Sequence, residues 1–487
     1  MTGIALVAAL VPLVAGAVVW VIPERLAGLV AAAALAIGAT GALALAIPVL
    51  AGEPIRAADG LVVIDALGGF VLLITVVIAA IAVAGSPAYL DHEPAIRARD
   101  RGRYWALLLW FIGGLLTVPL FDNLGLVWVA IEATTIVSAL LVGFARTPAA
   151  IEAAWKYLIL GSVGIGFALL GTLLAYASSI ELLGETSDAL AWTRLMAVAP
   201  SLDPGLVRLA FIFALVGYGT KTGLAPFHTW LPDAHSQAPS PVSALLSGAT
   251  LTVSLYALAR FHLVATGTLG PGFSSTALVV FGVLSLAVAL PFIVAQGDLK
   301  RLLAYSSIEH MGLGAMALGF GGPIALGGLV LHLLAHGLTK ASLFIAAGGL
   351  VERGRSRRIA RLSGSLTLDP VDGRAFLGGA LLLSGLPPSA LFVSEIAILF
   401  GGFSTGWGVP AAIAAVLLAL AVAGFLFHAG RMSFGSPRVR AVSQPARWRA
   451  IVVGTPLLVV VVLGVWTPQP LAAAIARVVA VLGGGDV

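Results

Sequence analysis

The stretch that decides the fold covers residues 219–241 and reads GTKTGLAPFHTWLPDAHSQAPSP. It places Lys221 deep in an apolar segment, which Pro226, Pro232, Pro239 and Pro241 then interrupt. A charged side chain at bilayer depth costs about 2.5–3.5 kcal/mol or more and persists mainly where it faces protein or water. The stretch therefore predicts a buried cation beside a broken membrane helix, and with it the movement of ions.

The composition predicts a polytopic membrane protein. Of 487 residues, 60% are hydrophobic and only 10% are charged, so water cannot solvate most of the surface. The chain has no cysteine, which excludes disulfides, thiolate-bound metals and iron–sulfur clusters held by cysteine. Basic residues flank apolar segments and do not alternate with aromatic residues on a polar face, so no nucleic-acid partner is expected.

Apolar stretches long enough to cross about 30 Å of hydrocarbon recur along the whole chain. We predict fourteen of them in one all-α domain of the lipid bilayer, 1–487, starting near residues 3, 27, 66, 104, 124, 155, 206, 241, 273, 302, 322, 374, 409 and 449. The seventh and the twelfth contain the proline clusters, and we expect each to be one broken helix. No soluble domain is evident.

The lysines and arginines predict the orientation. With the amino terminus outside, twenty of the 27 lie at the inner side, namely Arg25, Arg97, Arg99, Arg101, Arg103, Arg146, Lys156, Lys300, Arg301, Arg353, Arg355, Arg357, Arg358, Arg361, Arg374, Arg431, Arg438, Arg440, Arg447 and Arg449. Outside loops and ends hold Arg56, Arg194, Arg208, Arg260 and Arg477. This asymmetry follows the positive-inside rule, so we expect both termini outside.

A second interrupted segment, GLPPSALFVSE at residues 385–395, places Pro387 and Pro388 beside Glu395. Interrupted helices in corresponding positions of two halves indicate a transport site between related repeats. A break also exposes backbone groups that hydrocarbon cannot satisfy, so water or an ion can approach there.

Further ionisable side chains occur inside the predicted spans. They are Glu132 in the fifth span, His228, Asp233 and His235 around the first break, Glu309 and His310 in the tenth span, and His332, His336 and Lys340 in the eleventh. The last three recur every four residues, so they lie along one slowly turning stripe of a helix. Together with Lys221 and Glu395, they predict a polar file through the membrane interior.

Proton transfer is the chemistry that such a file can carry. Burial disfavours the charged forms of both lysine and glutamate, so the proton affinities of both move toward neutral pH. We expect Lys221 and Lys340 to carry protons, and Glu132 to hold or release the proton of Lys221. The histidines of the eleventh span are expected to relay protons, and Glu395 to be the exit-side group.

Several of these residues also have a plainer interpretation. Lys221 can snorkel to a membrane surface, and Glu132 can be a structural ion-pair partner. Glu309 can pair with Lys300 or Arg301 near the inner surface.

His332 and His336 have the i, i+4 spacing of a metal-binding pair. No carboxylate lies between them as in the His-Glu-x-x-His motif, and no third ligand is obvious. Helix packing is the plainer role for both, so no metal and no other cofactor is expected.

The segment from Lys221 to Ser247 resembles the antiporter-like membrane subunits shared by respiratory complex I, multisubunit sodium/proton antiporters and energy-converting membrane hydrogenases. The resemblance includes DLKRLLAYSS at 298–307 and HLLAHGLTKASLF at 332–344. IEATT at 131–135, EAAWKYLIL at 152–160 and SSIEHM at 306–311 look most like component F of hydrogenase-4.

The resemblance implies fourteen helices with two inverted five-helix repeats, about 104–264 and about 273–431. It implies a non-catalytic subunit of a redox-driven proton pump in the inner cell membrane, beside other membrane subunits and a soluble hydrogenase- or dehydrogenase-like arm. At matching positions it makes Glu132 the modulating glutamate, Lys221 the broken-helix lysine, Lys340 the connecting lysine and Glu395 the terminal carboxylate.

One departure puts part of the route in doubt. Many relatives have a lysine in the eighth span where this chain has Thr252, which cannot carry a charge. An alternative function is a subunit of a multisubunit sodium/proton antiporter, for which sodium would favour a further cluster of carboxylates and carbonyls. A structural anchor is disfavoured because so many buried charges are costly.

Overall fold

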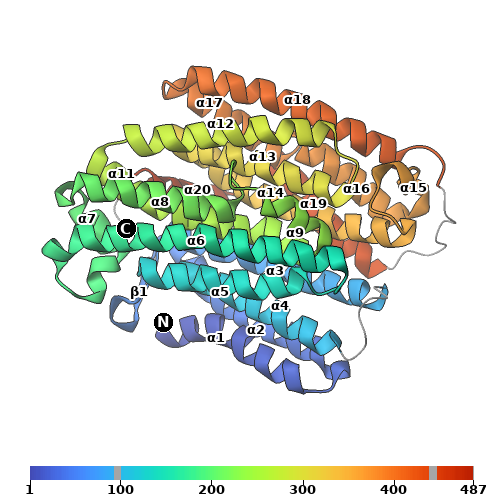
Figure 1. Ribbon diagram of the computed structural model, residues 1–487, viewed down its shortest axis with the longest axis horizontal. Helices are drawn as coiled ribbons and strands as arrows, with labels where there is room; N and C mark the ends of the chain where they lie inside the picture. The colour runs from blue at the N-terminus through green and yellow to red at the C-terminus, as the bar shows by residue number, and fades with distance from the viewer. Residues whose placement is uncertain (93–99, 438–446, 486–487) are drawn as a thin grey trace.

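The computed structural model is a bundle of long helices that run side by side along one axis (Figure 1). It describes residues 1–92, 100–437 and 447–485. The helices are α1 (Thr2–Val21), α2 (Glu24–Ala51), α3 (Ala66–His92), α4 (Arg101–Thr117), α5 (Leu124–Val142), α6 (Pro148–Leu183), α7 (Trp192–Val198), α8 (Pro204–Thr222), α9 (Trp230–Gln237), α10 (Ser240–Leu245), α11 (Leu251–Leu269), α12 (Gly272–Val294), α13 (Leu299–Phe320), α14 (Gly322–Gly354), α15 (Ser365–Leu368), α16 (Pro370–Leu383), α17 (Ala390–Ser404), α18 (Gly408–Ser433), α19 (Arg447–Val465) and α20 (Gln469–Leu482).

All fourteen predicted spans coincide with helices, which confirms the all-α polytopic fold. Eleven helical segments in the described ranges are long and apolar enough to cross a membrane, with α10 and α11 joined into one of them by a π-helical turn, η6 (Leu246–Thr250). The other three predicted spans correspond to α8, α13 and the pair α16–α17. A short antiparallel hairpin of β1 (Ile55–Ala57) and β2 (Val62–Ile64) is an addition that the sequence did not predict.

One predicted start was wrong by about two turns. Helix α6 begins at Pro148 and not near residue 155. Thr147 caps the helix by accepting a hydrogen bond from the backbone of Ala150, and Pro148 occupies the first helical position, where no N–H is needed.

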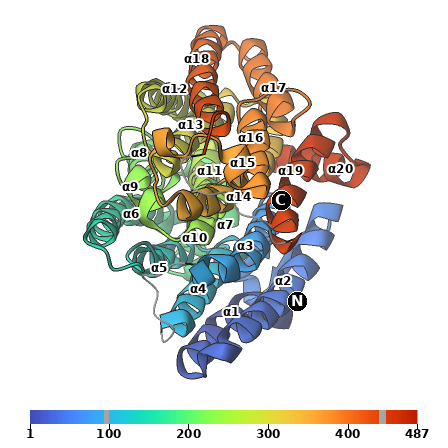
Figure 2. The same cartoon turned by 90° about the vertical axis from the view of Figure 1, so that its right-hand side faces the viewer.

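Helices α14 and α10–α11 lie in the middle of the bundle. Viewed along the helices, α1 and α2 form one edge, and α17 and α18 lie at the opposite edge (Figure 2). The apolar stretches of α11 and α14 are entirely buried by protein, whereas most of α18 faces outward. The central helices are therefore those that carry Thr252, His332, His336 and Lys340.

Both termini lie at the same end of the bundle, close to β1 and α7, while α15 lies at the other end (Figure 1). Isolated bridges between Val62 and Phe121 and between Asn123 and Ala191 join the loops of the first end. A chain that crosses the bundle an even number of times has both termini at the same end. Of the residues used to predict the orientation, Arg97, Arg99, Arg438 and Arg440 lie outside the described residues.

The two predicted helix breaks are present. Helix α8 ends at Thr222, where Gly223 adopts a left-handed conformation with φ of 85°, and α9 begins after a short turn. Helix α16 ends at Leu383, Gly385 has φ of 60°, and α17 begins at Ala390. Each break contains one cis X-Pro bond, preceding Pro226 and Pro388. The limits of the two repeats, 104–264 and 273–431, stay a prediction.

The placement of Arg260 in an outside loop was wrong. Arg260 lies within α11, is 1% exposed, and donates two hydrogen bonds to the Asp65 carboxylate at 2.6 and 2.7 Å. Its guanidinium also lies 3.8 Å from the ring centroid of Trp192. The side chain is tied to a neighbour 195 positions earlier in the chain, so no local pattern revealed it.

Candidate functional site

Lys221 is fully buried in the last turn of α8, directly before the first break. A cation at this position is favoured by the partial negative charge of the helix carboxyl end. Its Nζ donates to Thr135 Oγ1 at 2.7 Å and to the Tyr157 hydroxyl at 2.6 Å. Tyr157 also bonds Ser138 at 2.7 Å. Lys221 therefore does not snorkel, and its charge is held by hydroxyl groups from α5 and α6.

Glu132 lies on α5, partly buried, near Lys221. Its Oε1 accepts a hydrogen bond from Ser162 at 2.7 Å, while its buried Oε2 has no hydrogen-bond partner among the described residues. Glu132 and Lys221 interact electrostatically, while the hydrogen bonds of the Lys221 ammonium go to Thr135 and Tyr157. An electrostatic effect of Glu132 on Lys221 suits the predicted modulating role of Glu132. That role stays a prediction.

Lys340 lies in the middle of α14 and is fully buried. Its Nζ donates to the backbone carbonyl of Leu303 at 2.7 Å and to Ser306 Oγ at 2.5 Å, both on α13. One turn further along α13, the buried Glu309 interacts electrostatically with Lys340.

The alternative in which Glu309 pairs at the inner surface is not the arrangement observed. Arg301 pairs with Asp233 at 3.3 Å, and the Lys300 ammonium donates to the backbone carbonyl of Ala238 at 2.6 Å. Glu309 faces the interior, where its electrostatic partners are Lys340 and Glu395.

Three buried rings form a histidine cluster, which we define as His310, His332 and His336. Their centroids are 5.1, 5.2 and 6.1 Å apart. His310 Nδ1 and His332 Nε2 are 3.2 Å apart, and Glu395 Oε1 lies 3.8 Å from His310 Nδ1. The cluster therefore connects α13 and α14 to the carboxylate beside the second break.

His235, in α9 after the first break, is fully buried near Lys340. Its ring stacks on Phe344 with centroids 5.2 Å apart, and neither of its ring nitrogens has a hydrogen-bond partner among the described residues. Within the same part of the chain, both nitrogens of His336 are likewise buried without a hydrogen-bond partner. Buried polar groups are almost always hydrogen-bonded, so such positions call for internal water between the two halves.

The remaining predicted residues of the first break form its turn or make ion pairs near the protein surface. Pro226 and Pro232 lie in the turn and in α9, and His228 is buried beside them. Asp233 is partly exposed and pairs with Lys156 and Arg301, each at 3.3 Å. The aspartate therefore ties α6, α9 and α13 together and lies outside the buried file.

Thr252 is buried in α11 two residues after the end of the π-helical turn, and its hydroxyl donates to the carbonyl of Gly248 at 3.3 Å. Because a threonine hydroxyl carries no charge, Thr252 does not supply a cation between Lys221 and Lys340. A hydroxyl pair, Ser247 and Ser307 at 2.8 Å, instead joins the π-helical turn to α13. π-Helical turns are frequent at functional sites.

The uncharged partners of the lysines were the functional residues that sequence reasoning missed. Thr135, Tyr157 and Ser306 hold the ammonium groups, yet each is an ordinary residue of an apolar helix. Their only signal was position, since all three lie inside the segments IEATT, EAAWKYLIL and SSIEHM. Hydroxyls carry no charge penalty, so nothing in the composition distinguishes them.

The chain is similar to known membrane proteins along most of its length. It matches the family described as "NADH:quinone oxidoreductase/Mrp antiporter, TM" over residues 122–421. It is 39% identical over 413 residues to a hydrogenase-4 component F homolog of Methylacidiphilum infernorum, covering 83% of this chain and 85% of the relative. It is 34% identical over 406 residues to the NADH-quinone oxidoreductase subunit N of Desulforudis audaxviator, covering 80% of this chain and 77% of the relative.

A solved structure shares the fold over the full length. A chain of the membrane-bound sulfane sulfur reductase, an archaeal respiratory membrane complex, superposes with a TM-score of 0.89 at 22% identity, covering 99% of this chain and 98% of that chain.

Proposed function

Because this chain belongs to the NADH:quinone oxidoreductase/Mrp antiporter family of transmembrane proteins, we propose that it translocates protons as a non-catalytic subunit of a redox-driven membrane complex. The resemblance to a hydrogenase-4 component F homolog favours this function over that of a sodium/proton antiporter subunit.

One observation carries the proposal: Lys221 and Lys340, the two fully buried lysines, differ from the buried arginines in their partners. Arg260 and Arg449 lie against Asp65 and Asp372 at 2.6 and 2.8 Å. The ammonium groups of the two lysines contact hydroxyls and a backbone carbonyl instead. A buried ion pair neutralises its charge permanently, whereas a lysine held by neutral groups can lose and regain a proton at moderate cost.

The proposed path follows the geometry. Glu132 stabilises the protonated form of Lys221 through space, and the proton then passes through internal water near His235 to Lys340. From there the histidine cluster transfers it to Glu395 at the second break. The transfers from Lys221 to Lys340 and from the histidine cluster to Glu395 connect different helices, so a small shift of one helix can control them.

The complex is expected to contain other membrane subunits and a soluble hydrogenase- or dehydrogenase-like arm, and to reside in the inner cell membrane with both termini of this chain outside. Two relatives, one a homolog of a hydrogenase component and the other a subunit of an oxidoreductase, support membership of an assembly. The soluble arm, the particular membrane and the orientation are part of the proposal.

The test compares Lys221→Ala with wild type in inverted membrane vesicles that contain the intact complex. The initial rate of redox-driven proton uptake is expected to fall by about tenfold or more, since tenfold corresponds to only about 1.4 kcal/mol. Arg194→Ala is the control, because Arg194 is an exposed cation at the end of the bundle. Normal uptake by a fully assembled Lys221→Ala complex would refute the proposal.

Sodium separates the two function classes. Proton uptake that persists when choline replaces sodium supports the redox-driven pump. Sodium-dependent proton movement without any electron donor would instead establish antiport.

A further inference from the structure

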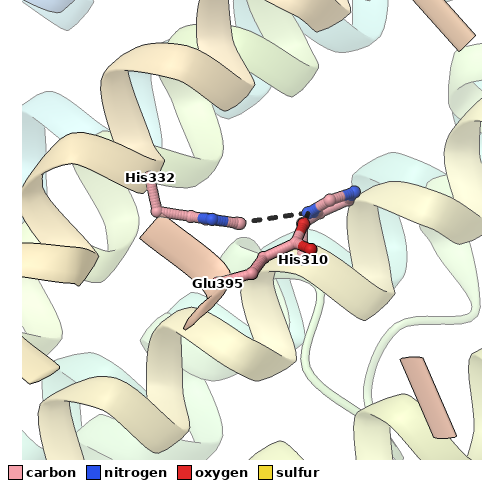
Figure 3. A group of neighbouring side chains, drawn as sticks. All are labelled: His310, His332 and Glu395. Atoms are coloured by element: carbon pink, nitrogen blue, oxygen red, sulfur yellow. Dashed lines mark hydrogen bonds and ion pairs between the residues drawn. The ribbon is translucent and has the colours of Figure 1, made fainter. Parts of the chain in front are cut away.

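Three side chains from three helices converge beside the second break. His310 of α13, His332 of α14 and Glu395 of α17 point toward one another (Figure 3). One ligand atom of each lies within 4.8 Å of the other two. The two histidines are almost completely buried, and the side chain of Glu395 is 13% exposed.

The spacing of these atoms fits a small tetrahedral metal ion. Zinc binds histidine nitrogen at about 2.0–2.1 Å and carboxylate oxygen at about 2.0–2.2 Å, so two ligand atoms of one tetrahedron lie about 3.3 Å apart. The nitrogens of His310 and His332 are 3.2 Å apart, and the Glu395 oxygen is 3.8 Å from the first of them. Two histidines and one glutamate are also the ligands of a known class of zinc site with an open fourth position.

The surroundings orient these ligands. His332 Nδ1 lies 3.0 Å from Ser394 Oγ, which leaves Nε2 of the same ring directed at His310. Metal-bound histidines usually have such a partner on the second ring nitrogen, and it fixes the ring. Glu309, which precedes His310 on α13, is a further buried carboxyl group near the site. The Glu395 carboxylate lies directly against Gly385 of the second break.

We propose that His310, His332 and Glu395 bind one divalent transition-metal ion of the zinc class, and that the bound ion stops proton transfer through the histidine cluster. The second half rests on the proposed function, because the ion uses the nitrogen lone pairs that would otherwise accept protons. From the sequence, His332 and His336 had the spacing of a metal pair, but no third ligand was obvious and no metal was expected. The ligands come instead from three helices, which no spacing in the sequence reveals.

The binding test uses the purified full-length chain in lipid nanodiscs, with zinc ions alone as the probe. Titration calorimetry is expected to show one zinc per wild-type chain. Zinc K-edge absorption is expected to show two nitrogens and one carboxylate oxygen at about 2.0–2.2 Å.

Variants identify the ligands. His332→Gln and Glu395→Gln are expected to lose the site, and Ser394→Ala is expected to weaken binding about 10- to 100-fold, as for other partners of metal ligands. His262→Gln is the matched control, because His262 is a buried histidine on α11 that takes no part in the cluster. Each variant is first checked for a monodisperse elution profile, and Glu395→Asp provides a second, milder change that shifts the carboxylate.

Binding and function are read separately, so the two proposals fail in different ways. Absence of zinc binding to wild type, or equal binding to His332→Gln and Glu395→Gln, overturns the site whatever the chain transports. Zinc that binds as expected but leaves redox-driven proton uptake in vesicles unchanged overturns the block. Two results together support both halves of the proposal. Zinc inhibits proton uptake in wild type and in His262→Gln, and inhibition of uptake in Ser394→Ala requires a 10- to 100-fold higher zinc concentration.

Discussion

Lys221 and Lys340, both fully buried, are held by groups that accept hydrogen bonds without neutralising the charge. For Lys221 these are Thr135 and Tyr157, and for Lys340 they are Ser306 and a backbone carbonyl. Hydrogen bonds to a charged group stabilise it by about 1.5–3 kcal/mol each. If the lysines carry protons as proposed, we expect these neutral partners to influence how readily each lysine gives up its proton.

Replacing Tyr157 by Phe tests this role at the residue scale. The substitution removes one acceptor from Lys221 and leaves the ring packed against Trp230, where the centroids are 4.6 Å apart. The protonated lysine loses about 1.5–3 kcal/mol, so we expect proton uptake to slow by about tenfold or more. Initial uptake rates in vesicles measure the effect.

Tyr176→Phe is the control, since Tyr176 lies on the same helix away from Lys221. Equal rates for the two tyrosine variants would show that the hydroxyl of Tyr157 has no part in proton transfer.

At the scale of elements, the helix breaks place the charges. Helix α8 must stop within the membrane for Lys221 to occupy its last turn, and Gly223 makes the stop by adopting a left-handed conformation. The second break positions Glu395 in a different way. Gly385 has no Cβ and so leaves space for the Glu395 carboxylate, with which a Cβ at this position would collide.

Gly223→Ala is expected to destabilise the protein and to slow proton uptake. A residue with a Cβ pays about 1–2 kcal/mol for the left-handed conformation, and this Cβ would also collide with Leu231. Thermal unfolding in detergent, followed by the loss of the monodisperse peak, measures the change.

Gly166→Ala is the matched control, because a Cβ there meets no atom within 4 Å. Alanine is favoured over glycine in a helix by about 1 kcal/mol, so this variant should be at least as stable as wild type. A Gly223→Ala protein as stable as Gly166→Ala would contradict the role of the glycine.

For the whole molecule, the fold decides that both termini lie at one end, and charge decides which end faces the cytoplasm. The loop after α6 lies at the end of the termini, and the loop around α15 lies at the opposite end (Figure 1). The second loop is rich in arginine, so we expect it inside.

Single cysteines test this orientation without background, because the chain has no cysteine of its own. In intact spheroplasts, a membrane-impermeant maleimide is expected to label Glu185→Cys and to label Ala360→Cys only after permeabilisation. Both positions are exposed, so accessibility within the protein is matched. The reverse labelling pattern would place the termini inside.

The sequence by itself determined the membrane class, the fourteen helices, the two breaks and the buried charges. These properties are local: an apolar stretch must match the bilayer thickness, a cluster of prolines beside a glycine in the left-handed conformation interrupts a helix, and a charge within such a stretch must face protein or water.

Only the tertiary structure decided which side chains meet. Lys221 contacts Tyr157, which lies 64 positions away in the sequence, and His332 contacts Ser394, which lies 62 positions away. Arg260 is a buried partner of Asp65, which lies 195 positions away. Such contacts depend on how helices rotate and pack against one another in the bundle, and helical periodicity alone does not specify that rotation. For the same reason, the convergence of His310, His332 and Glu395 became visible only in the folded chain.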